Sequence, residues 1–208
     1  MTKGHTVITG TTRTFGRDGA LIATLPSPRV TLDAHGDVAT EERLSATGVV
    51  ELRRQFTGGR LVAEERFAAD GQLDERVAYR YDASGHLAEE VMVFGDGTPH
   101  GTWIHRRDPS GRLIGRAFVK PDGSTEATET YRHAADGRSA TMVRAHVGQW
   151  TYRYDDDGRI LHEEGGPASG DDMDRVAIDY TYDARHRLTS EITRGPGGRV
   201  QRELTIAY

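Results

Sequence analysis

Glycines recur along the central part of this chain at two alternating intervals. They follow polar or small residues and lie 12 and then 14 residues apart, a repeat of 26: Gly59, Gly71, Gly85, Gly97, Gly111, Gly123 and Gly137. Less regular positions extend the series to fifteen predicted turn points: Gly19, Gly36 and Gly48 before it, and Gly148, Gly158, Gly170, His186 and Gly198 after it. Asp precedes several of these glycines, and Asp-Gly between alternating segments is a strong hairpin signal. The intervals leave room for short strands and predict very little helix.

The segments between the turn points alternate in polarity. Two residues after a turn point the residue is apolar at eleven of fifteen positions, with exceptions at Pro99, Thr125, Ser139 and Asp172. Five residues after it the residue is often charged, as at Glu41, Glu64, Glu90, Arg116, Glu163, Glu191 and Glu203. Period two with one apolar and one charged face is typical of half-solvated antiparallel strands. We therefore expect these charged residues on the water-facing side, paired across strands.

The pattern predicts an all-β fold: a continuous antiparallel meander of about 14–16 short strands within one domain, residues 1–208. Open sheets rarely exceed ~10 strands without curling or closing, so we expect a barrel or shell. A barrel of this size would leave a cavity, whereas two packed layers would not. Residues 165–174 have loop composition and are predicted as an insertion.

Composition and missing motifs exclude several functions. The absence of Cys excludes a disulfide scaffold and a cysteine nucleophile, and a net charge of −5 argues against a nucleic-acid partner. No apolar run is long enough to span a membrane, and no apolar leader follows Met1, so we expect a cytoplasmic protein. Nucleotide-binding, nucleophile-elbow and metal-ligand motifs are also missing, so we expect no cofactor and no metal.

Polar and aromatic residues at positions of the apolar face form the candidate site. Trp103, His105 and Arg107 share one face of their segment, and Glu129, Tyr131 and His133 share the same nominal face two segments further on. His162 and Trp150 fall on that face too. His105, His133 and Glu129 are the acid–base candidates, because imidazole titrates near neutrality and a desolvated carboxyl can approach it. The ligand-binding candidates are Trp103, Arg107, Tyr131, His162 and Trp150. The alternative is that all eight are ordinary sheet residues that pair across strands.

Three segments carry a resemblance to a known repeat. Residues 79–87 (YRYDASGHL), 152–160 (YRYDDDGRI) and 180–188 (YTYDARHRL) resemble the YD repeat of Rhs-type proteins. Degenerate copies such as 107–113 (RDPSGRL) carry the likeness over residues 12–208, and Pro121-Asp122-Gly123-Ser124 resembles the second turn of the repeat. The resemblance implies a sheet that spirals into a shell, which in long polymorphic toxins surrounds a toxin domain. This chain is far shorter, so a small molecule is a better expected content than a polypeptide.

Two functions of different classes follow. The first is a β-shell that binds a small apolar or amphipathic molecule, extended to a cofactor-independent cyclase or isomerase that moves a proton with His105, His133 or Glu129. Only two of 27 basic residues are lysines, which is typical of a GC-rich genome and suggests bacterial specialised metabolism. The second is a non-catalytic YD-repeat module that binds a protein or glycan.

Overall fold

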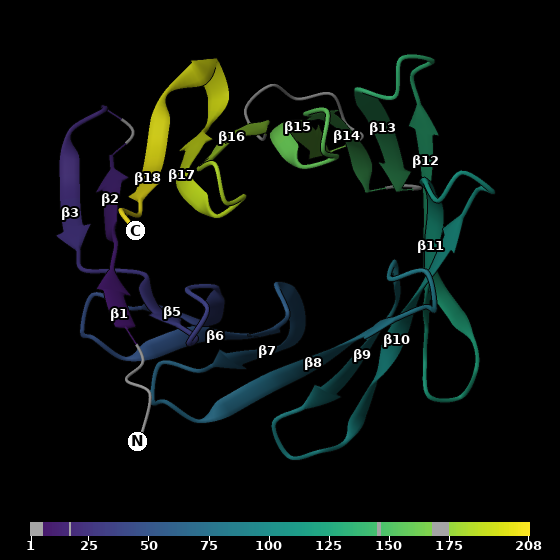
Figure 1. Cartoon of the computed structure of the whole chain (residues 1–208), viewed down its shortest axis with the longest axis horizontal. Coiled ribbons are helices and arrows are strands. Elements are labelled where there is room, and N and C mark those ends of the chain that lie inside the picture. The colour runs from purple at the N-terminus through teal and green to yellow at the C-terminus, as the bar shows by residue number, and fades with distance from the viewer. Residues whose placement is uncertain (1–5, 17, 145–146, 168–174) are drawn as a thin grey trace.

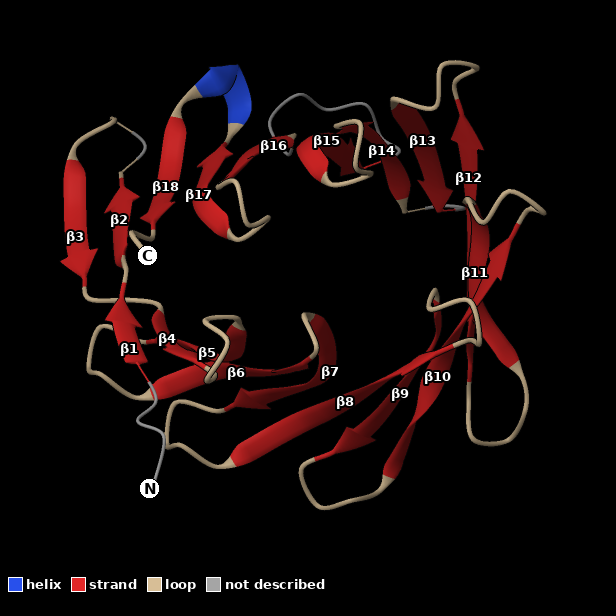
Figure 2. Cartoon of the chain, viewed as in Figure 1, coloured by secondary structure: helices blue, strands red, loops and turns tan. Residues whose placement is uncertain are grey.

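The chain folds into one antiparallel sheet of 18 strands in a computed structural model that describes residues 6–16, 18–144, 147–167 and 175–208. The strands are β1 Thr6–Thr9, β2 Thr11–Phe15, β3 Leu21–Leu25, β4 Arg29–Leu32, β5 Val38–Leu44, β6 Val50–Thr57, β7 Arg60–Phe67, β8 Leu73–Tyr81, β9 Leu87–Phe94, β10 Pro99–Arg107, β11 Leu113–Val119, β12 Thr125–His133, β13 Ser139–Arg144, β14 Gly148–Tyr154, β15 Ile160–Pro167, β16 Val176–Tyr182, β17 Leu188–Arg194 and β18 Val200–Thr205. Within the described ranges, the helical content is one 3-10 turn, η2 (Pro196–Gly198), shown in blue in Figure 2. No described helix has the length and apolar character that crossing a membrane requires. The predicted all-β class is confirmed.

The sheet curls into a ring whose two ends meet beside the N-terminal strands (Figure 1). Strands β4 to β18 pair in sequence order, β18 then pairs with β2, and β1 pairs with β4. Only Gly10 separates β1 from β2, so one stretch of chain joins both ends. A Cβ at Gly10 would lie 2.7 Å from Pro28 Cδ and 2.8 Å from the Thr205 carbonyl oxygen, which is why glycine stands there. The sheet is thus curled and is not closed into a barrel by one continuous ladder of strands. Strand β3 pairs with β2 on the side away from β18 (Figure 1).

The strand number exceeds the prediction because two segments are interrupted. The fifteen turn points delimit sixteen segments, and Gly10 and the Pro26–Pro28 stretch each divide one of them, which gives 18 strands. The predicted loop at 165–174 is also corrected, since β15 continues to Pro167 and pairs there with Gly148 of β14. The rest of that predicted loop, residues 168–174, lies outside the described residues.

The turns have the geometry that their sequence predicts. At the β8–β9 turn, the Asp82 N–H donates to the His86 carbonyl, the Gly85 N–H donates to the Asp82 carbonyl, and Gly85 has φ +83°. The Asp82 carboxylate accepts the His86 N–H at 2.9 Å, which closes the turn from the side-chain end. Twelve of the fifteen predicted turn points are glycines with positive φ, and His186 adopts φ +65° at a thirteenth. The turn prediction is confirmed at these positions, whereas Gly148 begins β14 and Gly170 is not described.

A β-bulge beside many of these turns changes which side chains share a face. Tyr81 pairs with Leu87 and Tyr79 pairs with Glu90, so an advance of two residues on β8 corresponds to an advance of three residues on β9. Leu87 and Glu90 therefore lie on the same face of the sheet, although they are an odd number of residues apart. In five further hairpins that turn at the same rim, the same register shift puts the residue that corresponds to Glu90 on the inner face: Glu41, Glu64, Arg116, Glu163 and Glu191.

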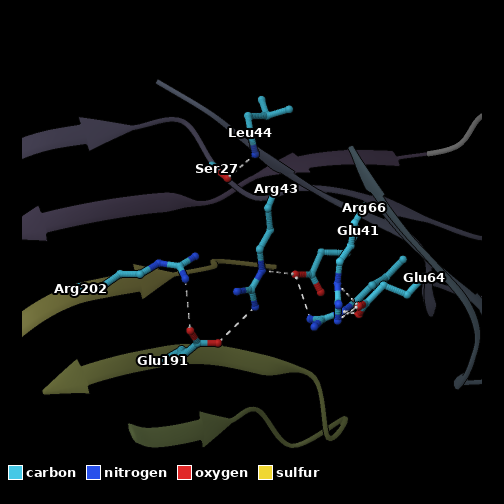
Figure 3. Close-up of polar contacts among 9 residues, drawn as sticks. Ser27, Glu41, Arg43, Leu44, Glu64, Arg66, Glu191 and Arg202 are labelled. Atoms are coloured by element: carbon cyan, nitrogen blue, oxygen red, sulfur yellow. Dashed lines mark hydrogen bonds and ion pairs between the residues drawn. The ribbon is translucent and has the colours of Figure 1, made fainter. Parts of the chain in front are cut away.

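The expectation that these charged residues face water is therefore wrong for six of the seven. Arg43 of β5 bonds Glu191 of β17 at 3.2 Å, from the opposing wall of the ring, so the face that carries both residues is the inner one (Figure 3). Direct strand pairing places the other five on that same inner face. Glu203 follows a turn at the other rim and lies on the outer face, where it pairs with Arg13.

The inner face combines an apolar core with a belt of charged residues. Buried Val30, Leu32, Leu204 and Ile206 form a core cluster where the ends of the sheet meet. Around the middle of the ring run the side chains that we call the inner belt: Glu41, Arg43, Arg54, Glu64, Glu90, Arg116, Glu129, Tyr131, Glu163, Tyr180 and Glu191. Hydrogen bonds between neighbouring strands satisfy most of these groups and so offset the free-energy cost of burying them.

Candidate functional site

Strands β9 to β13 gather a dense group of titratable and aromatic side chains on the inner face. We call it the β9–β13 cluster: Glu90 on β9, Trp103 and His105 on β10, Arg116 on β11, Glu129 and Tyr131 on β12, and Arg144 on β13. Direct cross-strand pairing produces it, since Glu90 lies opposite Trp103, His105 opposite Arg116, and Glu129 opposite both Arg116 and Arg144. The structure thus brings together four of the eight predicted site residues.

His105 and Glu90 form a buried hydrogen-bonded pair. The His105 Nε2 lies 2.8 Å from Glu90 Oε1, and only 5% of the imidazole side chain is exposed. Burial by itself raises the pKa of the Glu90 carboxyl, but the hydrogen bonds and charges of His105 and Arg116 outweigh it and hold that pKa below its ordinary value. The His105 Nδ1 is buried without a hydrogen-bond partner in the described part of the chain. Glu90 is therefore an anion that orients the imidazole.

Glu129 is the most enclosed carboxylate of the cluster. Its side chain is 1% exposed, and Arg116 binds both of its oxygens, with Nη2 at 3.2 Å from Oε1 and Nε closer still to Oε2. The Tyr131 hydroxyl donates to Oε2 at 3.0 Å, and burial raises the pKa of that phenol above its ordinary range. The carboxylate is thus engaged on both oxygens, an arrangement that suits a structural anchor better than a free general base.

Trp103 lies beneath two guanidinium groups. The Arg116 and Arg144 Cζ atoms lie 4.4 and 5.3 Å from the indole centroid, within the range of cation–π attraction. The Phe118 ring lies 5.4 Å from the same indole. The aromatic row continues from Phe118 to His100 at 5.5 Å and from His100 to Phe94 at 4.4 Å. This row makes a wall of aromatic rings on one side of the cluster.

A pocket of about 520 Å³ opens beside this wall. Its apolar lining consists of Met92, Trp103, Phe118, Ala127 and Val147, and its polar lining of His100, Glu126, Thr128 and Arg144. The volume falls within the range of small-molecule sites, which are mostly apolar with a few polar groups. Gly101 allows the wall to form, because a Cβ there would collide with the Phe118 ring. Trp103 and Arg144 belong to both the cluster and the pocket and join them.

The predicted residues His133 and Arg107 lie nearer one rim and make contacts that recur along the chain. His133 Nε2 donates to the Leu113 carbonyl at 2.6 Å, and Arg107 Nη2 donates to the Leu87 carbonyl at 3.4 Å. In the corresponding places, Tyr81 and Tyr182 donate to the carbonyls of Leu61 and Ile160. All four groups thus tie the end of one strand to the beginning of the strand directly before it.

His162 and Trp150 lie apart from the cluster. A bulge shifts the register at Tyr154, so His162 lies on the outer face, opposite Asp179, with its Nδ1 2.7 Å from Asp179 Oδ1. The predicted placement of His162 with the apolar face is therefore wrong. Trp150 is on the inner face, opposite Met142 and packed over Gly165, where a Cβ would collide with the indole.

Sequence reasoning missed Glu90, Arg116 and Arg144 as members of the site. Glu90 and Arg116 were assigned to the other face, and the bulge that moves them inward has no strong signal in a single sequence. A usable signal was their shared position five residues after a turn point, which recurs with the 26-residue repeat. No group of three or more His, Asp or Glu side chains suited to hold a metal ion occurs among the residues the structure describes.

Comparison with known proteins gives distant structural matches only. No protein-family model and no curated protein sequence matches the chain. A porin-like protein from Bacteroides uniformis has a TM-score of 0.45 and 11% identity over 100% of this chain and 97% of its own. A porin-like protein from Bacteroides vulgatus has a TM-score of 0.31 and 10% identity over 98% of this chain and 99% of its own. The TcdB2-TccC3 structure has a TM-score of 0.30 and 18% identity over 94% of this chain and 12% of its own. The function is therefore argued from the residues of the site.

Proposed function

We propose that the protein binds an amphipathic small molecule in the pocket on the inner face of β9–β13. The observation that carries the proposal is the pocket of about 520 Å³ whose lining combines the aromatic side chains of Trp103 and Phe118 with the guanidinium of Arg144. A concave site that is mainly apolar and has a few fixed polar groups is the usual form of a small-molecule site.

The rigidity of the surrounding residues supports this function. Phe118 is 8% exposed and packs over Gly101, while Trp103 is fixed between Phe118 and Arg116. Arg116 in turn is held by Glu90 and Glu129. Side chains that are already ordered lose little entropy when a ligand binds, so the pocket is preorganised. The inner belt thus serves the pocket as a support.

The acid–base residues predicted from sequence do not enter the proposal as catalysts. His105, Glu129 and His133 are absent from the lining of this pocket, and their hydrogen bonds go to Glu90, to Arg116 and Tyr131, and to the Leu113 carbonyl. We assign Glu129 and the His105–Glu90 pair to the positioning of Arg116 and Trp103. This makes binding, without a chemical step, the function that the site favours.

We also propose that the chain is a short relative of YD-repeat proteins. The support is the recurring contact in which Tyr81 and Tyr182, from two of the Tyr-Asp motifs, donate to a carbonyl of the preceding strand. Arg107 and His133 make the same contact in degenerate copies of the repeat. On this proposal the repeats build the ring. The pocket differs from the rest of the inner face because Trp103 and Phe118 place aromatic rings there.

A dye titration tests the proposed function. N-phenyl-1-naphthylamine, a neutral amphipathic dye, should bind the wild-type protein with a rise in fluorescence at about one dye per chain. Ala127→Phe would fill the pocket from β12 and should abolish the rise, whereas Thr130→Phe, on the exposed outer face of the same strand, should leave it unchanged. Circular dichroism and thermal unfolding check that both variants fold. No binding by the wild type, or equal binding by the Ala127→Phe variant, would overturn the proposal.

A further inference from the structure

Arg144 lines the pocket, and acidic side chains neutralise its charge less fully than they neutralise the charge of Arg116. Among the residues that the structure describes, its acidic partner is Glu129, with Arg144 Nε 3.9 Å from Glu129 Oε1, at the outer limit of an ion pair. A third of the Arg144 side chain, 34%, is exposed. Arg116, by contrast, contacts two carboxylates and is 25% exposed. Both arginines face the same indole, but only Arg144 lines the pocket.

Glu129 has little capacity left for Arg144. Arg116 occupies both of its oxygens, and the Tyr131 hydroxyl adds a further hydrogen bond to Oε2. The other acidic residue of the pocket, Glu126, pairs with Lys120 at 3.2 Å and is 52% exposed, so water screens it. The pocket therefore offers a guanidinium whose charge is only partly compensated.

Arg144 is also held in place for a ligand. Its guanidinium lies over the Trp103 ring at 5.3 Å, and this contact limits the positions that the long side chain samples. A guanidinium presents several donors in one plane, which matches the two oxygens of a carboxylate or sulfonate. The apolar lining from Phe118, Met92 and Val147 lies in the same pocket. An anionic head group and an apolar body can thus be satisfied together.

We propose that the ligand is an amphipathic organic acid, whose anionic group pairs with Arg144 and whose apolar body packs against Phe118, Met92 and Trp103. This inference rests on the proposed small-molecule function and adds the charge of the ligand. The negative group replaces the weak contact between Arg144 and Glu129, and Glu129 keeps Arg116 and Tyr131 as partners. Neutral analogues fill the same apolar space without that ion pair.

Two dyes that differ in charge separate this inference from the function it rests on. 1-Anilinonaphthalene-8-sulfonate has the naphthylamine body of the neutral N-phenyl-1-naphthylamine plus one sulfonate. The wild type should bind the sulfonate about tenfold or more tightly than the neutral dye, the gain expected from one charge-assisted hydrogen-bonded pair. Arg144→Gln should remove that preference, so that this variant binds the two dyes with affinities within about twofold of each other. Arg132→Gln, on the exposed outer face of β12, should change neither, and Arg144→Lys should retain part of the preference.

Each outcome decides one of the two proposals. Failure of the neutral dye to bind the wild type overturns the proposed function and this inference with it. Binding of the neutral dye with no gain from the sulfonate overturns only the inference. A preference that survives in the Arg144→Gln variant also overturns it, because another cation is then responsible. Loss of both dyes in Arg144→Gln with no recovery of the preference in Arg144→Lys overturns it too, since Arg144 then acts on the shape of the pocket.

Discussion

Replacing Glu64 with Gln tests whether the periodic glutamates support the protein from the inside of the ring. Glu64 lies on β7 with 3% of its surface exposed. Its Oε2 accepts a hydrogen bond from Arg54 at 2.9 Å, and its Oε1 accepts two from Arg66, at 2.8 and 3.1 Å (Figure 3). Gln has the same shape but no charge, and its amide nitrogen would face a guanidinium instead of an acceptor oxygen.

The structure sets the size of the effect. Hydrogen bonds to charged groups stabilise by about 1.5–3 kcal/mol each, and breaking a buried ion pair costs about 3–5 kcal/mol. The arginines lower this cost, since Arg66 also bonds Glu75 at 3.0 Å and is 53% exposed, and Arg54 lies 3.7 Å from Glu41. We therefore expect Glu64→Gln to reduce the free energy of unfolding by about 2–3 kcal/mol at pH 7.

Glu89→Gln is the matched control. Glu89 pairs with Arg80 at 3.1 Å on the outer face, and the two side chains are 39% and 66% exposed. Such a surface pair contributes about 0–1 kcal/mol. Urea unfolding followed by tryptophan fluorescence, with a common slope for all three proteins, measures the difference. Equal losses for the two variants, or a Glu64→Gln loss below about 0.5 kcal/mol, would refute the inner placement of Glu64.

Three further predictions concern the turns, the pocket wall and acid. His186→Gly should raise the free energy of unfolding by about 0.5–1 kcal/mol in a urea titration, because glycine removes the strain of φ +65°, and a loss of stability would contradict this. Gly101→Val should abolish binding of N-phenyl-1-naphthylamine by displacing Phe118, while near-ultraviolet circular dichroism reports the altered aromatic packing; unchanged dye affinity would argue against the wall. The pKa of Glu90 is lowered from 4.5, so its contribution is present above about pH 4.5 and lost as the pH falls through the folded value. Urea unfolding at pH 7 and pH 3 should therefore show Glu90→Gln clearly less stable than wild type at pH 7 and a smaller difference at pH 3, and a constant difference would contradict the assignment.

The turns could be predicted from the sequence because their causes are local. Gly85 and Asp82 close their turn with contacts that span four residues, and His186 was recognised as a substitute for glycine from spacing alone. The faces of the strands could not be predicted with the same success. One extra residue at Ala88 reverses the alternation, so Glu90 joins Leu87 on the inner face instead of opposing it. That error moved a whole row of glutamates to the wrong side of the sheet.

The site was predicted in part for the same reason. Trp103, His105, Glu129 and Tyr131 come from strands whose pairing follows sequence order, so a shared face was enough to bring them together. His162 lies beyond a bulge and was misplaced. The closure of the ring through β1, β2 and β18 depends on contacts between residues nearly 200 positions apart, as between Thr12 and Leu204, and no local pattern indicates them.

The charged lining is a consequence of the curvature of the sheet. In a ring of this many strands, opposing walls exchange side-chain contacts where the ends of the sheet meet, as between Arg43 and Glu191. Along β9–β13 the inner glutamates pair with residues of nearby strands, so Glu90 and Glu129 bind Arg116 instead of a residue across the ring. Pairing between neighbouring strands leaves the charges matched only along the sheet. Glu90 and Glu129 share Arg116, and Arg144 at the margin has its acidic partner 3.9 Å away. The residual charge of the pocket thus follows from how the curved sheet distributes its ion pairs, which is why a change at Glu129 should alter the charge preference of the pocket as well as stability.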